Sequence, residues 1–268
     1  MRRLPLIIGA TITIVLVAAA ILSRFWTPMD PAAINIAVRL KGPGPGGLFG
    51  ADQFGRDELS MIMAGAWTSL SIAFSAVAIG GAAGAALGMA AAARRGAAEA
   101  AIMRANDIVF AFPPVLSALL LAAVLGGGPA TTVTAIALFM VPVFARVCRG
   151  AALRIWARDY ILAARMAGKT GLTITLEHVL PNIAAQIIVQ VAIQTGLAIL
   201  TEAGLSFLGL GVAPPTPSWG RMLADAQTYL ATAPHLVLAP GLAIAFSVLG
   251  LNLLGDGLGR LTDPRETA

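Results

Sequence analysis

Residues Ser69–Ala93 read SLSIAFSAVAIGGAAGAALGMAAAA, a run with no charged side chain. About 20 mainly apolar residues in a helix are enough to cross the hydrocarbon core of a bilayer, so this run predicts a membrane-spanning helix. Within it, Gly80, Gly84 and Gly88 recur at four-residue spacing. Small residues at that spacing let a neighbouring backbone approach closely, which predicts that the helix lies in a tightly packed bundle.

Five further stretches are long and apolar enough to form spans. They are Leu4–Leu22, Ile108–Leu125, Thr131–Val147, Ile183–Leu208 and Val237–Leu254. The fold class is therefore predicted to be all-α, a polytopic helical membrane protein with six transmembrane helices. In the third span, Phe112–Pro113–Pro114 is expected to bend or break the helix about one turn from its cytoplasmic end.

Composition supports the same class. Of the 268 residues, 58% are hydrophobic and 12% are charged, and the mean hydropathy is +0.84. Soluble domains are about 45–50% apolar and about 25% charged, so this chain would expose large apolar patches to water. A soluble enzyme, a disordered chain and a secreted disulfide scaffold are excluded. The single cysteine, Cys148, is predicted to be a small packing residue.

The net charge of +5 is attributed to Lys and Arg in cytoplasmic loops rather than to nucleic-acid binding. With the N-terminus in the cytoplasm, thirteen of the 18 Lys and Arg residues fall inside. The other five are Arg24, Arg39, Lys41, Arg56 and Arg221. Both termini are therefore expected to be cytoplasmic.

The first span could instead be a cleaved signal peptide, with Arg2 and Arg3 before it and Ala18–Ala20 as the cleavage site. A retained anchor is favoured because the apolar run continues through Leu22.

No catalytic, metal or cofactor site is predicted. The two histidines, His178 and His235, fall on opposite sides of the membrane in this topology, so they cannot share a metal. Residues Ala163–Thr170 (AARMAGKT) resemble a phosphate-binding P-loop, but that motif needs a strand before it and a helix after it. Roughly 35 residues between two spans are too few for a nucleotide-binding domain. The chain is expected to be no enzyme and to bind no cofactor.

The longest cytoplasmic loop, Arg149–Asn182, is the first candidate site. Tyr160–Gly168 is predicted to be a helix that ends at its glycine. A second helix-like stretch, Leu172–Val179, is expected to be stopped by Leu180–Pro181–Asn182. A short amphipathic helix that projects from a membrane can dock in a groove of a soluble partner. The alternative is an interfacial helix that lies on the lipid surface.

The second candidate site surrounds Glu202, in the outer part of the fifth span. An acid at that depth usually faces a cavity or a polar partner. Residues from Ala203 to Gly220 are rich in Gly and Pro and are predicted to form a packed external loop that rims a pore, with Trp219 at the membrane interface. Glu202, Ser206, Phe207 and Trp219 are therefore candidates for the translocation path or an outer gate. The alternative for Glu202 is a buried acid whose hydrogen bonds neighbouring helices satisfy.

These segments resemble the permease subunits of bacterial ABC importers of the dipeptide/oligopeptide/nickel family, in particular the C-type member of the permease pair. Four blocks carry the resemblance: Gly50–Asp57 with Leu59 and Ser60, Asp107–Pro113, Tyr160–Asn182, and Glu202–Gly220 (EAGLSFLGLGVAPPTPSWG). A weaker fifth block is Pro240–Gly241 with Asn252–Asp256. The resemblance implies a bundle like that of type I ABC importer permeases.

The resemblance also implies a coupling loop of the "EAA" type. Residues Tyr160, Ala163, Ala164, Gly168, His178, Pro181 and Asn182 match or fit that pattern. Leu162 stands where the family has Glu, which removes a carboxylate that could pair with a base on the ATPase. Docking of the loop by packing is still expected.

The implied machine has a second homologous permease subunit, two cytoplasmic ATPase subunits and an external solute-binding protein, with the chain in the lipid bilayer of the bacterial inner membrane. It would pass peptides or related small solutes, nickel chelates among them, into the cytoplasm.

We divide the chain into an anchor span with an external loop (residues 1–68) and a permease core (residues 69–268) with the coupling loop at about 149–182. The alternative function is an ion-gradient-driven secondary transporter, which would usually show paired intramembrane acids or an inverted repeat; a channel or scaffold is a third.

Overall fold

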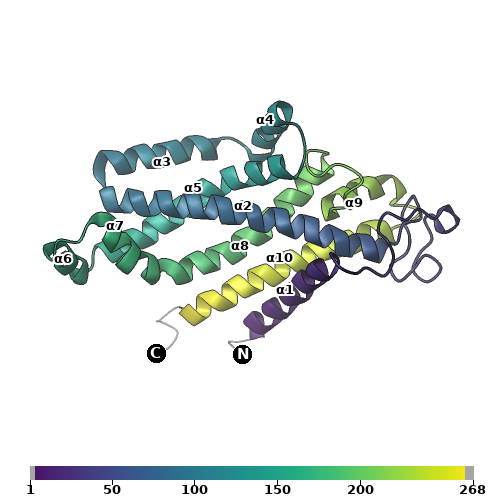
Figure 1. Ribbon diagram of the computed structural model, residues 1–268, viewed down its shortest axis with the longest axis horizontal. Helices are drawn as coiled ribbons and strands as arrows, with labels where there is room; N and C mark the ends of the chain where they lie inside the picture. Colours follow the sequence, from purple (N-terminus) through teal and green to yellow (C-terminus); the bar gives the residue numbers. More distant parts are fainter. Residues whose placement is uncertain (1–3, 263–268) are drawn as a thin grey trace.

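The structure, a computed structural model, describes residues 4–262 as an elongated bundle of helices (Figure 1). In chain order the helices are α1 (Leu4–Leu22), α2 (Glu58–Arg94), α3 (Gly96–Ala111), α4 (Pro114–Leu125), α5 (Pro129–Trp156), α6 (Asp159–Met166), α7 (Gly171–Ile174), α8 (Leu180–Phe207), α9 (Trp219–Ala226) and α10 (His235–Thr262). Short 3-10 turns lie at Ile36–Val38 and Gln227–Tyr229, and a π-helical turn at Thr175–Val179. Among the described residues the only bridges are isolated ones, Gly44 with Gly47 and Ala51 with Asp57.

Five of the described helical segments are long and apolar enough to cross a membrane, and the bent pair α3–α4 makes a sixth if it counts as one span. The all-α, polytopic prediction is confirmed, and the predicted bounds of α1 agree with the structure. The other spans are longer than their apolar runs. Helix α2 begins at Glu58, not at Ser69, because the Asp57 side chain caps it by accepting a hydrogen bond from the Ser60 N–H at 2.9 Å.

The third span is broken where the sequence indicates, but not as close to its end as predicted. The axes of α3 and α4 differ by 84° across Phe112 and Pro113. Helix α3 is 16 residues long, so the break follows several turns of helix rather than one. The predicted start of this span at Ile108 is wrong, because residues Gly96–Asp107 are also helical although they include charged residues.

The predicted close approach at the glycines of α2 is confirmed, and the neighbour is α5. A Cβ added at Gly80 would overlap the carbonyl oxygen of Ala137, one at Gly84 that of Val141, and one at Gly88 that of Ala145. The contacts advance by four residues on both helices. The two backbones therefore run side by side with almost nothing between them.

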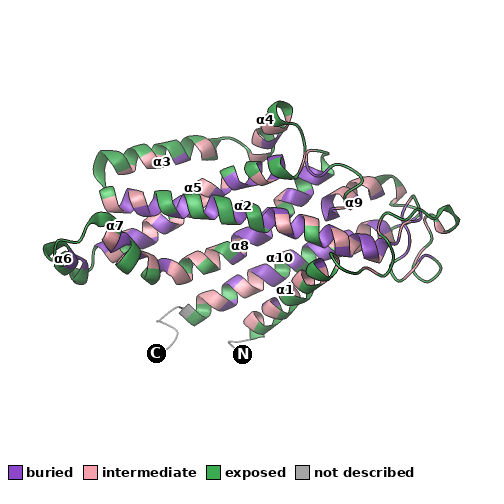
Figure 2. Cartoon of the chain, viewed as in Figure 1, coloured by how far each residue is buried: buried purple, intermediate pink, exposed green. Residues whose placement is uncertain are grey.

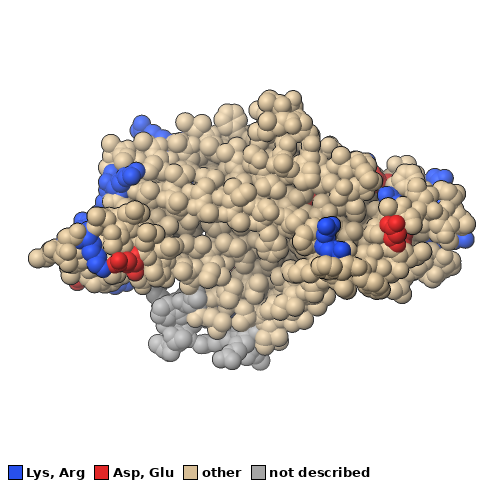
Figure 3. All heavy atoms as spheres, viewed as in Figure 1, with Lys and Arg blue, Asp and Glu red and all other residues tan. Residues whose placement is uncertain are grey.

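The core of the bundle is formed by α2, α5, α8 and α10, and Figure 2 shows buried residues along each of these helices. Helix α1 lies along α10, where Gly9 contacts the backbone near Gly250 and Leu254. Helix α9 sits at the end of the bundle opposite α6 and α7 (Figure 1). Figure 3 shows Lys, Arg, Asp and Glu gathered toward these two ends of the visible face, with mostly other residues between them.

The helix that follows α7 is not stopped at Pro181, and this part of the prediction is wrong. Gly171–Phe207 runs on as one helical segment through a π-helical turn just before the proline. In that wider turn the Leu180 N–H reaches the Thr175 carbonyl, which makes room for the proline ring. The Asn182 side chain donates to the His178 carbonyl at 2.6 Å.

Candidate functional site

Helices α6 and α7 form a projection at one end of the bundle, beyond the ends of α2 and α5 (Figure 1). Its inner face is apolar and buried: Ile161 and Ala164 of α6 and Ile174 of α7 pack into a cluster with Trp156, the last residue of α5. The Arg165 guanidinium lies 5.0 Å from the centroid of the Trp156 ring. These contacts attach the projection to α5 as an ordered element.

Gly168 ends α6 as predicted. Its φ is +79°, a conformation that glycine adopts without strain. The Lys169 N–H donates to the Ala164 carbonyl at 3.2 Å, and the Gly168 N–H donates to the Arg165 carbonyl at 2.9 Å. This pair of bonds is a Schellman motif, which satisfies carbonyls that a helix end leaves free. It sets the angle between α6 and α7.

The structure brings together three of the residues that the sequence proposed for this site, Tyr160, His178 and Asn182. The rings of Tyr160 and His178 meet edge to face, with centroids 6.1 Å apart. Lys169, next to Gly168, pairs with Glu177 and lies 3.5 Å from His178 Nε2. Asn182 caps the His178 carbonyl, as described above. Ala163 and Pro181 are exposed, and Ala164 is buried.

The outer face of the projection carries large apolar side chains, which we call the apolar docking face. Its members are Tyr160, Leu162, Met166, Leu172 and Leu176, with exposed fractions from 45% to 90%. Met166 is the most exposed of them, at 90%. Leu162 adds to this face at the position where a carboxylate was expected. The face therefore suits contact with another apolar surface rather than with water.

The residues around Glu202 form a second, buried cluster. Glu202, Ser206 and Trp219 are fully buried, and the Ser206 hydroxyl donates to Glu202 Oε1 at 2.7 Å. Ser69 and Ser218, also fully buried, face the same carboxylate. Phe207 points away from the cluster and is 40% exposed.

Trp219 does not lie at the membrane interface, so that prediction is wrong. It packs against Gly65 of α2, its Nε1–H donates to the Ile62 carbonyl at 3.0 Å, and its backbone N–H donates to Ser69 Oγ at 3.2 Å. The stretch after Glu202 also differs from the prediction, since α8 continues to Phe207 and only residues 208–218 form a loop. These contacts fix α9 to α2, and in this conformation Glu202 borders no open space.

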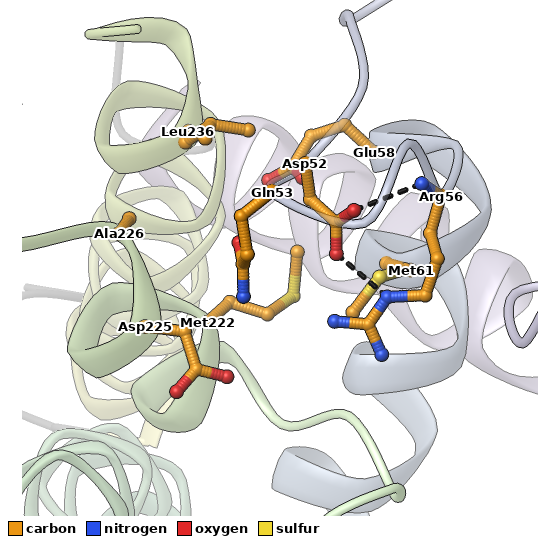
Figure 4. Close-up of a pocket in the computed structure, with 9 residues that line it drawn as sticks. All are labelled: Asp52, Gln53, Arg56, Glu58, Met61, Met222, Asp225, Ala226 and Leu236. Carbon is orange, nitrogen blue, oxygen red and sulfur yellow. Dashed lines mark hydrogen bonds and ion pairs between the residues drawn. The ribbon is translucent and has the colours of Figure 1, made fainter. Parts of the chain in front are cut away.

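Two ion pairs flank the end of the bundle that carries α9. Asp52 Oδ1 accepts hydrogen bonds from the N–H groups of Phe54 and Arg56, each at 2.8 Å, and Asp52 Oδ2 accepts from Arg56 Nε at 2.6 Å. Figure 4 shows this pair opposite Asp225, across a cavity with room for about one water. Asp225 pairs with Arg221 at 2.9 Å. Asp52, Asp57 and Glu58 are buried, and residues of α9 and α10 lie opposite Asp52 and Glu58.

A third group of charges was not singled out from the sequence. Arg146 and Arg149 of α5 pair with Asp107 and Glu99 of α3. Arg149 was placed at the start of the cytoplasmic loop because the apolar run stops at Val147, whereas α5 continues to Trp156. The spacing of Glu99, Met103 and Asp107 at four-residue steps could have placed the two acids on one helical face.

Three comparisons with known proteins agree. Residues 84–267 match the family model described as "Binding-protein-dependent transport system inner membrane component". The chain is 42% identical over 258 residues to the glutathione transport system permease protein GsiD of Escherichia coli O6:K15:H31 (strain 536 / UPEC), which covers 96% of this chain and 85% of that protein. The GsiD protein of Shigella boydii serotype 4 (strain Sb227) gives the same figures.

Among solved structures, the chain resembles one from "Inward facing conformations of the MetNI methionine ABC transporter: CY5 native crystal form". The TM-score is 0.64 at 17% sequence identity, and the match covers 76% of this chain and 96% of the other. At that identity the likeness concerns the fold.

Proposed function

This chain belongs to the family of binding-protein-dependent transport system inner membrane components, and we propose that it carries small peptides of the glutathione class through a pore formed with a second, homologous permease subunit. It is a permease subunit of an ATP-driven ABC importer of peptide-like solutes in the inner membrane. ATP hydrolysis takes place on separate ATPase subunits, and an external binding protein is a further partner. The secondary transporter considered from the sequence is set aside.

For the solute, the 42% identity to glutathione permeases over 96% of the chain supports a small charged peptide. For the assembly, we propose two permeases and two ATPases with one binding protein.

The basic residues support an orientation with both termini and the α6–α7 projection in the cytoplasm. A cysteine introduced at Lys169 should then be protected from an impermeant external thiol reagent, and one at Leu48, which is 73% exposed in the loop before α2, should react; the reverse pattern would contradict this orientation.

For the first span, the packing of α1 along α10 supports retention in the mature protein. Gly257 contacts Leu6, and Gly250 contacts Ile12, so α1 fills a groove that runs along α10. Loss of α1 would expose both glycines. We therefore keep residues 1–68 as an anchor span with an external loop, attached to a permease core.

The single observation that supports the coupling role is the apolar docking face. Large side chains such as Met166 and Leu172 are exposed at the bundle end that the orientation places in the cytoplasm. Burying a side chain of this size stabilises a complex by about 1.5–3 kcal/mol, so several of them can hold an ATPase subunit without an ion pair at Leu162. We propose that ATP-driven closure of the ATPases moves this projection, and that the motion is transmitted to α5 and α8.

Gly168→Val tests this coupling role. No atom lies within 4 Å of a Cβ at Gly168, so the variant creates no clash, but it forces a β-branched residue into a left-handed conformation. We expect normal membrane insertion, with reduced co-purification of the ATPase subunits or ATP hydrolysis uncoupled from uptake.

Gly171→Val is the matched control. A Cβ at Gly171 also meets nothing within 4 Å, and Gly171 is an ordinary helical residue without positive φ. It should associate and transport like the wild type. Wild-type association and uptake in Gly168→Val would end the coupling proposal.

A further inference from the structure

The face formed by α3 and α5 contains an open cavity of about 480 Å³. It is lined by Gly96, Glu99, Ala100, Met103 and Asp107 of α3 and by Arg146 and Arg149 of α5. Solute sites of about 300–1,000 Å³ accommodate molecules of drug size, which includes a tripeptide. Its lining residues belong neither to the apolar docking face nor to the buried Glu202 cluster.

The charged side chains in this cavity are at least partly exposed. The Arg146–Asp107 pair, with 2.7 Å between Arg146 Nη2 and Asp107 Oδ1, has side-chain exposures of 42% and 60%. In the Arg149–Glu99 pair the exposures are 36% and 18%. Both arginines lie in the second half of α5, toward the α6–α7 projection, in a helix that is apolar and long enough to span the membrane. Charged groups at such positions face water or protein, because exposing them to lipid is costly.

The break between α3 and α4 also indicates that this side of the bundle faces protein or water rather than lipid. Phe112 is 53% exposed, and its neighbours Ala111 and Pro113 are also exposed. The end of α3 and the start of α4 leave backbone groups without partners inside a helix. Irregular backbone of this kind is tolerated at membrane depth only where it is buried in protein or lines a water-filled space. The break starts five residues after Asp107, and Phe110, which lies between them, contacts Arg146 of the cavity.

The side chains around the arginines are arranged for a polar ligand. The Arg146 guanidinium lies 4.4 Å from the centroid of the Phe110 ring, which in turn stacks on Phe139 with centroids 5.5 Å apart. This stacking restricts the Arg146 side chain, so less conformational freedom is lost when it binds an anion. Guanidinium groups bind carboxylates through paired hydrogen bonds, and the acids opposite them are matched to an ammonium group.

We infer that this cavity is a solute site on the translocation path, in which Arg146 and Arg149 bind the carboxylates of a peptide-like zwitterion and Glu99 and Asp107 bind its ammonium group. The inference rests on the proposed function, since it assumes a charged peptide as the solute. It places the path along α3 and α5 rather than at Glu202.

Accessibility of the cavity is tested first, in the complete importer in lipid nanodiscs. Cys148, which is buried, is replaced by Ala, and Met103→Cys is introduced at the cavity wall. Ile14→Cys on α1, a 66% exposed site on the outside of the bundle, is the control. Because thiolates form in water and not in lipid, Met103→Cys should react about tenfold faster than Ile14→Cys with a cationic thiosulfonate.

The solute is tested with S-methylglutathione, a peptide-like zwitterion without a thiol. It should slow the labelling of Met103→Cys and leave that of Ile14→Cys unchanged. Equal reaction rates for the two cysteines, or no protection, would overturn the inference.

Transport is tested with the double variant Arg146→Gln/Asp107→Asn, which removes both charges and keeps hydrogen-bonding groups of similar shape. ATP-dependent uptake of S-methylglutathione into proteoliposomes should fall about tenfold, the effect of one lost charge-assisted bond. Arg104→Gln, on α3 but outside the cavity lining, removes one charge and should leave uptake unchanged.

The charge-exchanged variant Arg146→Asp/Asp107→Arg distinguishes solute binding from a structural tie. It restores an ion pair between α3 and α5, so the yield and melting temperature of the complex should match the wild type while uptake stays low. Recovery of uptake, or wild-type uptake in the neutral double variant, would overturn the site. Absence of uptake by the wild-type complex would instead overturn the proposed solute, and with it the ligand assigned here.

Discussion

Helix α5 meets α2 and α3 through contacts of opposite kinds. Against α2 it presents backbone and small side chains, and Gly80, Gly84 and Gly88 leave no room even for a methyl group. Against α3 it presents two arginines, which contact acids of α3 directly and line an open cavity with them. The first contact is dry and has one arrangement, because close-packed interiors do not deform gradually. The second is partly exposed, and its long side chains can re-pair when the helices separate.

The difference indicates where the permease is rigid and where it can move. A conformational change that opens and closes a path needs elements that keep their packing and surfaces that exchange partners. The α2–α5 contact is suited to the first role, and it continues into the projection through Trp156 and Ile161. The α3–α5 contact is suited to the second. Motion received at α6 would thus reach α2 and α5 as one body.

The largest change in stability is expected from a variant that disrupts the dry contact between α2 and α5. In Gly84→Val the new Cβ would overlap the Val141 carbonyl and approach Phe144, and both helices would have to separate. Overpacking of this kind should lower the free energy of unfolding by about 3 kcal/mol. Unfolding in detergent, followed by circular dichroism, measures the change.

Gly150→Val is the control for that variant. It lies on α5, and a Cβ at Gly150 meets nothing within 4 Å. Its stability should equal or slightly exceed the wild type, since valine has a higher helix propensity than glycine. If Gly84→Val is as stable as Gly150→Val, α2 and α5 do not pack as described. They would then not move as one rigid body.

The next effect concerns a buried acid, in contrast to the exposed acids of α3. In Glu202→Leu the Ser206 hydroxyl loses its acceptor inside the core, which should cost about 2 kcal/mol of unfolding free energy. Glu202→Gln keeps an acceptor at the same place and should cost less than about 1 kcal/mol. Chemical unfolding of the three proteins provides the comparison. If Glu202→Leu has wild-type stability but no longer transports the solute, Glu202 lies on the translocation path.

The dry contact could be predicted from the sequence, whereas the charged one could not, for a physical reason. Glycines spaced by four on one helix are a local pattern, and so is the Gly168 helix end. Glu99 and Arg149 are far apart in the chain, and no local pattern pairs them. Trp219 was placed at the membrane interface from its residue type alone, but its surroundings are set by α2. Apolar runs located the spans and underestimated their lengths, because capping and tertiary packing extend helices into polar sequence.

The smallest expected effect measures the strength of the partly exposed contact between α3 and α5. Glu99→Gln, Arg149→Gln and the double variant form a thermodynamic cycle whose coupling energy belongs to the pair alone. Partly exposed ion pairs contribute about 0–1 kcal/mol, because water competes for both groups and the long side chains lose freedom when they pair. Because both charges are partly exposed, the coupling in unfolding experiments should lie within that range and shrink further at high salt. A coupling of about 3 kcal/mol or more, insensitive to salt, is typical of a buried pair. That result would make the α3–α5 contact a rigid tie like its neighbour, and the movement would then have to occur elsewhere in the bundle.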